Sequence, residues 1–218
     1  MIFSKMAFPV ALVALFMAPA MSTPTGPVDV DNDVDNVAEA SNPVTWNVKA
    51  HPDGPEVTLT GTVEEVYSQL VSMNPSYDED WASVNATAPA ILNDDDLKLG
   101  SQFTHYNEKD SLTCDFHPRA HVKTIQKGIT YLRKVHGTPT MGPGPNACGR
   151  VSCSYNAAIF WCNTSKSVKK LPAYNNIADG AQVILNICIN RMYDGAEFTS
   201  GLLHHNDDWD VIVRHDKC

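Results

Sequence analysis

The position of its cysteines is the strongest constraint on this sequence. All six lie in the second half of the 218-residue chain, at positions 114, 148, 153, 162, 188 and 218. An even number of cysteines in a small chain indicates a disulfide framework when the protein enters an oxidising compartment. Spacing alone leaves many pairings open. We therefore expect residues 114–218 to form a disulfide-stabilised domain, provided that the chain is secreted.

The N-terminal residues predict secretion. Lys5 precedes an apolar run over residues 6–17, and Ala18 and Ala20 place small side chains where a signal peptidase cleaves. Residues 1–20 are therefore expected to be a signal peptide. A run of about 12 apolar residues is too short to span a bilayer, and we expect no transmembrane anchor. The predicted location is extracellular.

Charge divides the chain at the same place as the cysteines. The whole chain carries 25 acidic and 16 basic side chains, a formal net charge of −9. Residues 21–113 hold 17 acidic and three basic residues, whereas residues 114–218 hold eight acidic and 12 basic ones. The net charge argues against nucleic acid and anionic membranes as partners of the whole chain.

The acidic half has its own pattern. Residues 21–44 are polar and lack aromatics, which predicts a disordered acidic leader. Its alternating aspartates superficially resemble a calcium-binding loop, but Val34 occupies the position where such a loop needs a glycine. Residues 45–113 predict a β-hairpin over 46–59 and a helix that starts with a Thr62–Glu65 capping box and ends at Asn74. The stretch 76–111 receives no assignment. This half is either a pro-segment that masks the basic half or an added packing layer, and the hairpin and helix favour the packing layer.

Residues 114–218 predict an α+β fold with helices packed on an antiparallel sheet. Apolar residues at helical spacing predict a helix over 122–132, with Gly128 inside it at a cost of about 1 kcal/mol. A Pro- and Gly-rich connector follows over 138–146, then two strands over 150–155 and 157–162. A second helix over 177–188 is expected to be capped by Asn176 with Asp179, and the last strand runs from Trp209.

The segments CGRVSC (148–153) and NAAIFWC (156–162) resemble the central hairpin of killer-toxin-like secreted fungal proteins, relatives of the smut-virus toxin that blocks calcium channels. The helix ending at Cys188, the strand from Trp209 to Cys218 and the position of Cys114 resemble the same plan. The resemblance covers residues 114–218 and also extends to small cysteine-rich fungal effectors. It implies a disulfide-stabilised, killer-toxin-like α/β sandwich for this half. The toxin itself has more cystines and no acidic region before them.

The resemblance also implies a pairing and a binding surface. The implied disulfides are Cys114–Cys188, Cys148–Cys162 and Cys153–Cys218, the first tying two helical segments together. In the toxin a basic residue just before the central-strand cysteine matters, and Arg150 is the nearest residue here, one position further out. Arg150 is alternatively a strand-edge cation kept in water. A second basic cluster comprises Lys166, Lys169 and Lys170, in the loop after the hairpin.

Sequence motifs for catalysis or metal binding are scarce. Cys114, His117 and His121 have a spacing that suits zinc, but a secreted cysteine is more readily oxidised, and we expect no metal or other cofactor. His204 and His205 stand beside Asp207, Asp208 and Asp210, a set that a hydrolase would be able to use. The sequence contains no nucleophile elbow, zinc-protease motif or P-loop. Asn85 and Asn163 begin glycosylation sequons.

These observations predict a monomeric, secreted effector-type protein that acts by binding rather than by catalysis. The resemblance implies a host protein outside the cell or at the plasma membrane, or a cell-wall polymer, as its partner, and an effect on plant immunity or cell death. The aromatic-rich hairpin and its basic flank are the expected contact surface. The alternatives are a channel-blocking antifungal toxin and a small secreted hydrolase.

Overall fold

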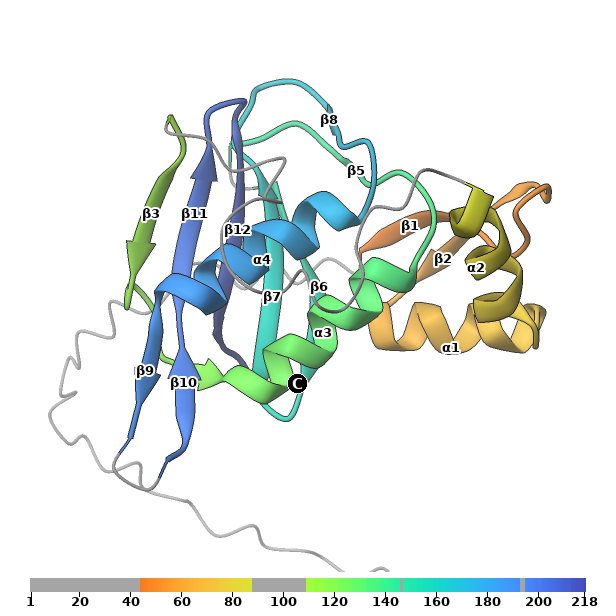
Figure 1. Cartoon of the computed structure of the whole chain (residues 1–218). Coiled ribbons are helices and arrows are strands. Elements are labelled where there is room, and N and C mark those ends of the chain that lie inside the picture. The colour runs from red at the N-terminus through yellow and green to blue at the C-terminus, as the bar shows by residue number, and fades with distance from the viewer. Residues whose placement is uncertain (1–43, 88–108, 146, 193–194) are drawn as a thin grey trace, which may run out of the picture. The chain divides into compact units, whose positions relative to one another are not determined.

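Five strands form the central sheet of the computed structural model, which describes residues 44–87, 109–145, 147–192 and 195–218. The strands are β3 (Ser111–Cys114), β6 (Ala147–Ser154), β7 (Ala157–Asn163), β11 (Gly201–His205) and β12 (Trp209–His215). Their order is β3-β11-β12-β7-β6, and every neighbouring pair is antiparallel (Figure 1). The predicted strands β6, β7 and β12 are confirmed, whereas β3 and β11 were not predicted. The expected signal peptide and most of the leader lie outside the described residues.

Two helices lie on one face of this sheet, as the α+β prediction requires. Figure 1 shows α3 (Val122–Lys134) and α4 (Asn175–Ile187) crossing the same face, and α3 buries the predicted stripe of Ile125, Ile129 and Leu132. Gly128 allows the close approach of α3 to β6, because a Cβ atom there would stand 2.3 Å from the hydroxyl of Ser152. Gly128 lowers the intrinsic stability of the helix, but the missing side chain lets the helix pack closely against the sheet.

The predicted cap of α4 is wrong. The helix begins at Asn175 with Tyr174 at the N-cap position, so Asn176 lies inside the first turn. Its side-chain oxygen accepts a hydrogen bond from the backbone N–H of Ala173, at 3.0 Å. Asp179 pairs with Arg133 of α3 at 2.8 Å. Tyr174 at the N-cap position makes no side-chain cap hydrogen bond, and its ring is buried in the core.

Residues 44–87 form a hairpin and two helices. The predicted hairpin is present as β1 (Thr45–Lys49) and β2 (Glu56–Thr60), and the predicted capped helix as α1 (Val63–Met73). The Glu65 carboxylate accepts the backbone N–H of Thr62 at 2.8 Å, as the capping box requires. Helix α2 (Tyr77–Thr87) was not predicted, because Tyr77 and Trp81 are its only buried or half-buried apolar side chains among those described.

Short strands join distant parts of the chain. A three-stranded sheet has the order β4 (Ala120–His121), β10 (Glu197–Thr199) and β9 (Ile189–Arg191). The expected connector over 138–146 contains β5 (Thr140–Met141), which pairs with β8 (Lys169–Lys170). The expectation of a connector without an element is therefore corrected. Pairing over two residues leaves no periodic pattern in the sequence.

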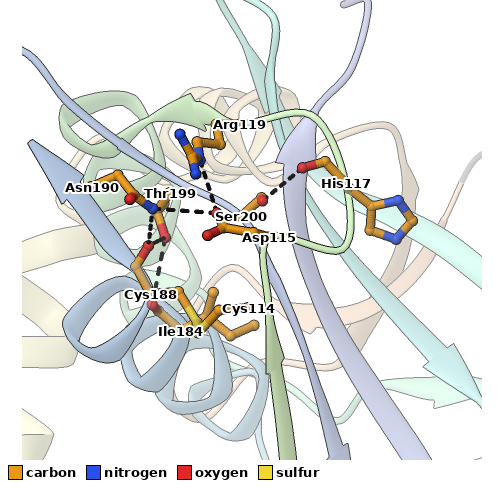
Figure 2. The surroundings of a disulfide bond; sticks show 9 residues. All are labelled: Cys114, Asp115, His117, Arg119, Ile184, Cys188, Asn190, Thr199 and Ser200. Atoms are coloured by element: carbon orange, nitrogen blue, oxygen red, sulfur yellow. Dashed lines mark hydrogen bonds and ion pairs between the residues drawn. A yellow bond between two sulfur atoms is a disulfide. The ribbon is translucent and has the colours of Figure 1, made fainter. Parts of the chain in front are cut away.

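Three disulfides cross the second half of the chain, between the pairs that the resemblance implies. Cys148–Cys162 joins neighbouring strands, and Cys153–Cys218 ties β6 to the residue that follows β12 by three positions. Cys114–Cys188 ties the edge strand β3 to the end of α4 rather than joining two helices (Figure 2). None of the described helices is long and apolar enough to cross a membrane. The three disulfides are consistent with a secreted protein.

Side chains from both halves of the chain share one core. Trp46 of β1 is fully buried and stacks on Tyr174, with ring centroids 4.6 Å apart, and its indole N–H donates to the carbonyl of Gly61. Val63, Val66 and Leu70 of α1 belong to the same cluster of buried residues as Ile159 and Val211 of the central sheet. Residues 44–81 therefore pack as a layer against the cysteine-rich half.

Candidate functional site

The central sheet has a second face, opposite α3 and α4. Val211 of β12 lies against Gly180 of α4, and Ile159 of β7 lies against Gly128 of α3. Side chains alternate along a strand, so Ile212, Phe160 and their in-register neighbours lie on the other side. We call this side the open face and define it by the outward residues of β3, β6, β7, β11 and β12. These are Ser111, Thr113, Cys148, Arg150, Cys153, Ala158, Phe160, Cys162, Leu202, His204, Asp210, Ile212 and Arg214.

A row of apolar side chains crosses the open face and ends at a cation. Leu202 lies directly opposite Ile212, Ile212 opposite Phe160, and Phe160 opposite Arg150. All four are half-buried. The guanidinium of Arg214 lies over the Phe160 ring, 4.6 Å from its centroid. We call Leu202, Ile212, Phe160, Arg150 and Arg214 the apolar–cationic row. Phe160 is thus the aromatic that the hairpin presents on this face, whereas Trp161 is buried.

Arg150 is held in place by the end of the chain. Its Nη1 donates to the Asp216 carboxylate at 2.7 Å and to the Lys217 carbonyl at 2.8 Å. Arg214 donates to the other oxygen of the same carboxylate at 3.2 Å. Two guanidinium groups therefore share one carboxylate, which leaves this end of the row with a net positive charge. The side chains of Arg150 and Arg214 are 23% and 25% exposed, so neither is a freely moving surface cation.

The predicted basic residues do not form one surface. Lys169 donates to the backbone carbonyl and the carboxylate of Asp207, which precedes β12, whereas Arg150 pairs with Asp216, which follows β12. These partners are separated by the length of the strand, about 23 Å for seven residues. Lys169 is mostly buried, and Lys166 and Lys170 are exposed. Burial opposes ionisation of Asp207, but hydrogen bonding and charge from Lys169 outweigh it and lower the pKa of that carboxyl.

The neighbouring histidines face opposite sides of the sheet. His204 lies on the open face, where its Nδ1 is 2.6 Å from an oxygen of Asp210, the residue directly opposite on β12. His205 lies on the helix side, stacks on Trp209 at 3.6 Å and stands 3.4 Å from Asp110. The predicted set of two histidines and three aspartates is therefore divided between two faces. Ser111 of β3 is exposed and lies directly opposite His204.

A polar and aromatic cluster joins α2 to the cysteine-rich half. Trp81 stacks on His136 with ring centroids 3.8 Å apart, and the Tyr77 hydroxyl donates to the Lys134 carbonyl at 3.0 Å. Burial lowers the pKa of His136 to about 4 and raises the pKa of Tyr77 to about 12. Tyr67 and Lys134 both donate to the Asp78 carboxylate, at 2.7 Å each. The sequence analysis did not predict this cluster. Its one local signal is that Tyr77 and Trp81 are four residues apart, which places both on one face of a helix.

The remaining predicted positions are structural in the described chain. Cys114 is in a disulfide, so its thiolate is not available to the zinc spacing of His117 and His121, and the described residues contain no metal-binding group of His, Cys, Asp or Glu. Asn163 is fully buried, and its amide nitrogen donates to the carbonyls of Gly142 and Ser167. A glycan needs this nitrogen, which the folded site does not present to solvent. Asn85 lies in α2, and its glycosylation stays a prediction.

The residues around Cys114–Cys188 stabilise the end of β3. Asp115, which has a left-handed backbone with φ of 58°, accepts hydrogen bonds from Arg119 at 2.8 Å and from Asn190 at 3.2 Å (Figure 2). Ser200 donates to the carbonyl of His117 at 2.7 Å, and burial lowers the pKa of that histidine. These contacts fix the edge strand that carries Ser111.

No family model, no curated protein and no solved structure matches this chain.

Proposed function

We propose that this protein is a secreted effector-type protein that acts by binding, and that the apolar–cationic row is its contact surface. The observation that carries the proposal is the row itself: three half-buried apolar side chains in register across neighbouring strands, ending at two guanidinium groups. Aromatic and arginine side chains dominate the binding energy of protein interfaces. Held in fixed positions, these side chains lose little conformational entropy on binding.

The charge of the row favours an anionic partner. Arg150 and Arg214 share the single carboxylate of Asp216, and a guanidinium recognises carboxylate or phosphate oxygens with two parallel hydrogen bonds. The partner proposed is a host protein outside the cell or at the plasma membrane, or a cell-wall polymer, that offers an acidic group beside an apolar one. The effect on plant immunity or cell death rests on the resemblance of residues 148–162 to killer-toxin-like proteins, as does the assignment of residues 114–218 to a killer-toxin-like α/β sandwich.

The test compares variants of the purified protein infiltrated into leaves. Arg150→Gln changes the cationic end of the row and Ile212→Ser its apolar part. We expect each to lower cell-death activity by about tenfold or more, as for a residue that contributes over 1.4 kcal/mol to binding. Arg191→Gln is the matched control, because Arg191 is an exposed arginine in the three-stranded sheet and pairs with Glu197. Near-ultraviolet circular dichroism checks that each variant is folded.

The same samples distinguish the alternatives. Inhibition of fungal cultures that calcium relieves, without any effect on leaves, would favour the channel-blocking toxin. Full activity of Arg150→Gln and Ile212→Ser in every assay would refute the row as the contact surface. The effector proposal fails if the wild-type protein has no effect on leaves and binds no component of a host extract.

A further inference from the structure

Three adjacent strands of the open face place a hydroxyl, an imidazole and a carboxylate in one line. Ser111 of β3 lies opposite His204 of β11, and His204 lies opposite Asp210 of β12. Directly opposed residues of an antiparallel pair have Cβ atoms about 5 Å apart, close enough for their side chains to meet. None of these three side chains belongs to the apolar–cationic row.

The hydrogen bond between His204 and Asp210 orients the ring. Nδ1 of His204 is 2.6 Å from the Asp210 oxygen, and the Asp210 side chain is only 14% exposed. The two ring nitrogens are distinct, and a partner on Nδ1 leaves Nε2 to act toward a different group. Asp210 approaches His204 from β12, whereas Ser111 approaches from β3, on the other side of β11. This is the order of nucleophile, base and orienting carboxylate that acyl-transfer enzymes use.

We propose that Ser111, His204 and Asp210 form a catalytic site for the hydrolysis of carboxylic esters. Ser111 is the nucleophile, His204 the general base and Asp210 the residue that holds the imidazole. The side chain of His204 is 39% exposed and Ser111 is exposed, so a substrate reaches both from solvent. In the described chain Ser111 makes no hydrogen bond to His204, a contact that commonly tightens only when substrate binds.

The proposed reaction proceeds in two balanced steps. Ser111 Oγ attacks the ester carbonyl carbon while its proton passes to His204 Nε2, and the alcohol leaves with that proton as the acyl–oxygen bond breaks. Water then attacks the acyl-serine, giving its proton to His204, which returns it to Ser111 as the carboxylic acid departs. The oxyanion would lie at the outer edge of β3, where the backbone N–H groups that point away from β11 pair with no other strand among the described residues.

The neighbours of the site define the substrate class. Leu202 precedes His204 by two residues on the same face of β11, and Ile212 follows Asp210 by two residues on the same face of β12. An acyl chain bound at Ser111 would therefore lie on apolar side chains. We infer esters with a short, uncharged acyl group, for which p-nitrophenyl butyrate is a suitable probe.

The test combines a fluorophosphonate reagent, which phosphonylates nucleophilic serines, with hydrolysis of p-nitrophenyl butyrate by the full purified protein. Peptide mass spectrometry is expected to place the label on Ser111, and Ser111→Ala to abolish both label and hydrolysis. His204→Gln should slow both by about 100-fold and Asp210→Asn by at least about tenfold, because each removes general-base assistance. Thr113→Ala is the matched control, since Thr113 is the next outward hydroxyl of β3, and it should react like the wild type.

Two results would overturn the proposal. One is labelling of Ser111 that is no faster than that of Ser167, an exposed serine in the loop after β7. The other is a His204→Gln variant that is labelled and hydrolyses ester at the wild-type rate. Mass determination of the intact disulfides and circular dichroism confirm that each variant is folded, so that a lost activity is assigned to the site. Neither readout depends on the leaf assay.

Discussion

Residues 44–87 contain no cysteine and contact the rest of the molecule through side chains and backbone hydrogen bonds, whereas residues 109–218 are crossed by three disulfides. Both regions contribute fully buried residues to the same core. The first region is held by Trp46 against Tyr174, by Ser152 donating to Glu64 at 2.6 Å and by Trp81 against His136. Two regions that share one core are therefore stabilised differently, residues 44–87 by packing and hydrogen bonds and residues 109–218 also by disulfides.

Losing a disulfide and losing a packing contact are expected to affect the protein in different ways. A disulfide acts mainly by restricting the unfolded chain, so its loss lowers stability without opening the core. A packing contact acts in the folded state, so its loss leaves a cavity and an exposed surface on the partner region. We therefore expect residues 44–87 to separate from the core under conditions in which residues 109–218 stay folded.

The largest effect is expected from removing Cys114–Cys188 by alanine at both positions. This bridge spans 74 residues and Cys148–Cys162 spans 14. The chain-entropy relation gives losses of about 4.5 and about 3 kcal/mol in the free energy of unfolding, respectively. Urea unfolding of the two double-alanine variants measures both. Equal losses would show that native packing around each bridge, and not loop length, determines its contribution.

Trp46→Ala is expected to lower the free energy of unfolding by about 4 kcal/mol, because it removes a fully buried indole and its hydrogen bond to Gly61. The cavity lies where the cysteine-free region meets Tyr174, so limited proteolysis should cut residues 44–87 first. Tyr155→Ala, at a side chain that is 86% exposed, is the matched control and should change stability by less than about 0.5 kcal/mol. Cleavage of residues 44–87 and of residues 109–218 at the same rate would contradict the expected difference in stability between the two regions.

Local sequence patterns predicted the elements with a strong period or a specific cap. The stripe of Ile125, Ile129 and Leu132 and the Thr62–Glu65 capping box are both present. Helix α2 was missed because its described side chains place only Tyr77 and Trp81 against the core. The strands β3 and β11 were missed because their identity depends on pairing with partners far along the chain.

The candidate sites were harder to predict than the fold. Arg150 was singled out from the sequence, but its carboxylate partner Asp216 lies 66 residues away, so its ion pair leaves no local signal. His204 and Asp210 were noted with their neighbours, yet alternation along β11 separates His204 from His205, and Ser111 enters only through strand pairing. Sheet register, which the sequence does not specify between distant strands, decides which side chains meet.

The smallest predicted effect is a pH dependence of the contact between Trp81 and His136. Burial lowers the pKa of His136 from 6.5 to about 4, so the unfolded chain binds a proton between these values that the folded chain does not. The contribution of His136 to stability should therefore fall as the pH drops from about 6.5 to about 4 and change no further below that. Because part of the ring contacts solvent, we expect a loss of about 1–2 kcal/mol rather than the full linkage value.

His136→Phe isolates this contribution, since phenylalanine keeps an aromatic ring beside Trp81 but does not titrate. His117, whose pKa burial also lowers, destabilises the fold in the same direction as the pH falls. The informative quantity is therefore the difference in unfolding free energy between wild type and His136→Phe, measured by urea titration from pH 7.5 to pH 4. A difference that grows in favour of the variant toward acid, together with earlier proteolysis of residues 44–87 in the wild type, would place the acid-sensitive contact between the two regions. A difference independent of pH would mean that His136 takes up its proton equally in both states, and that the interface is held by packing alone.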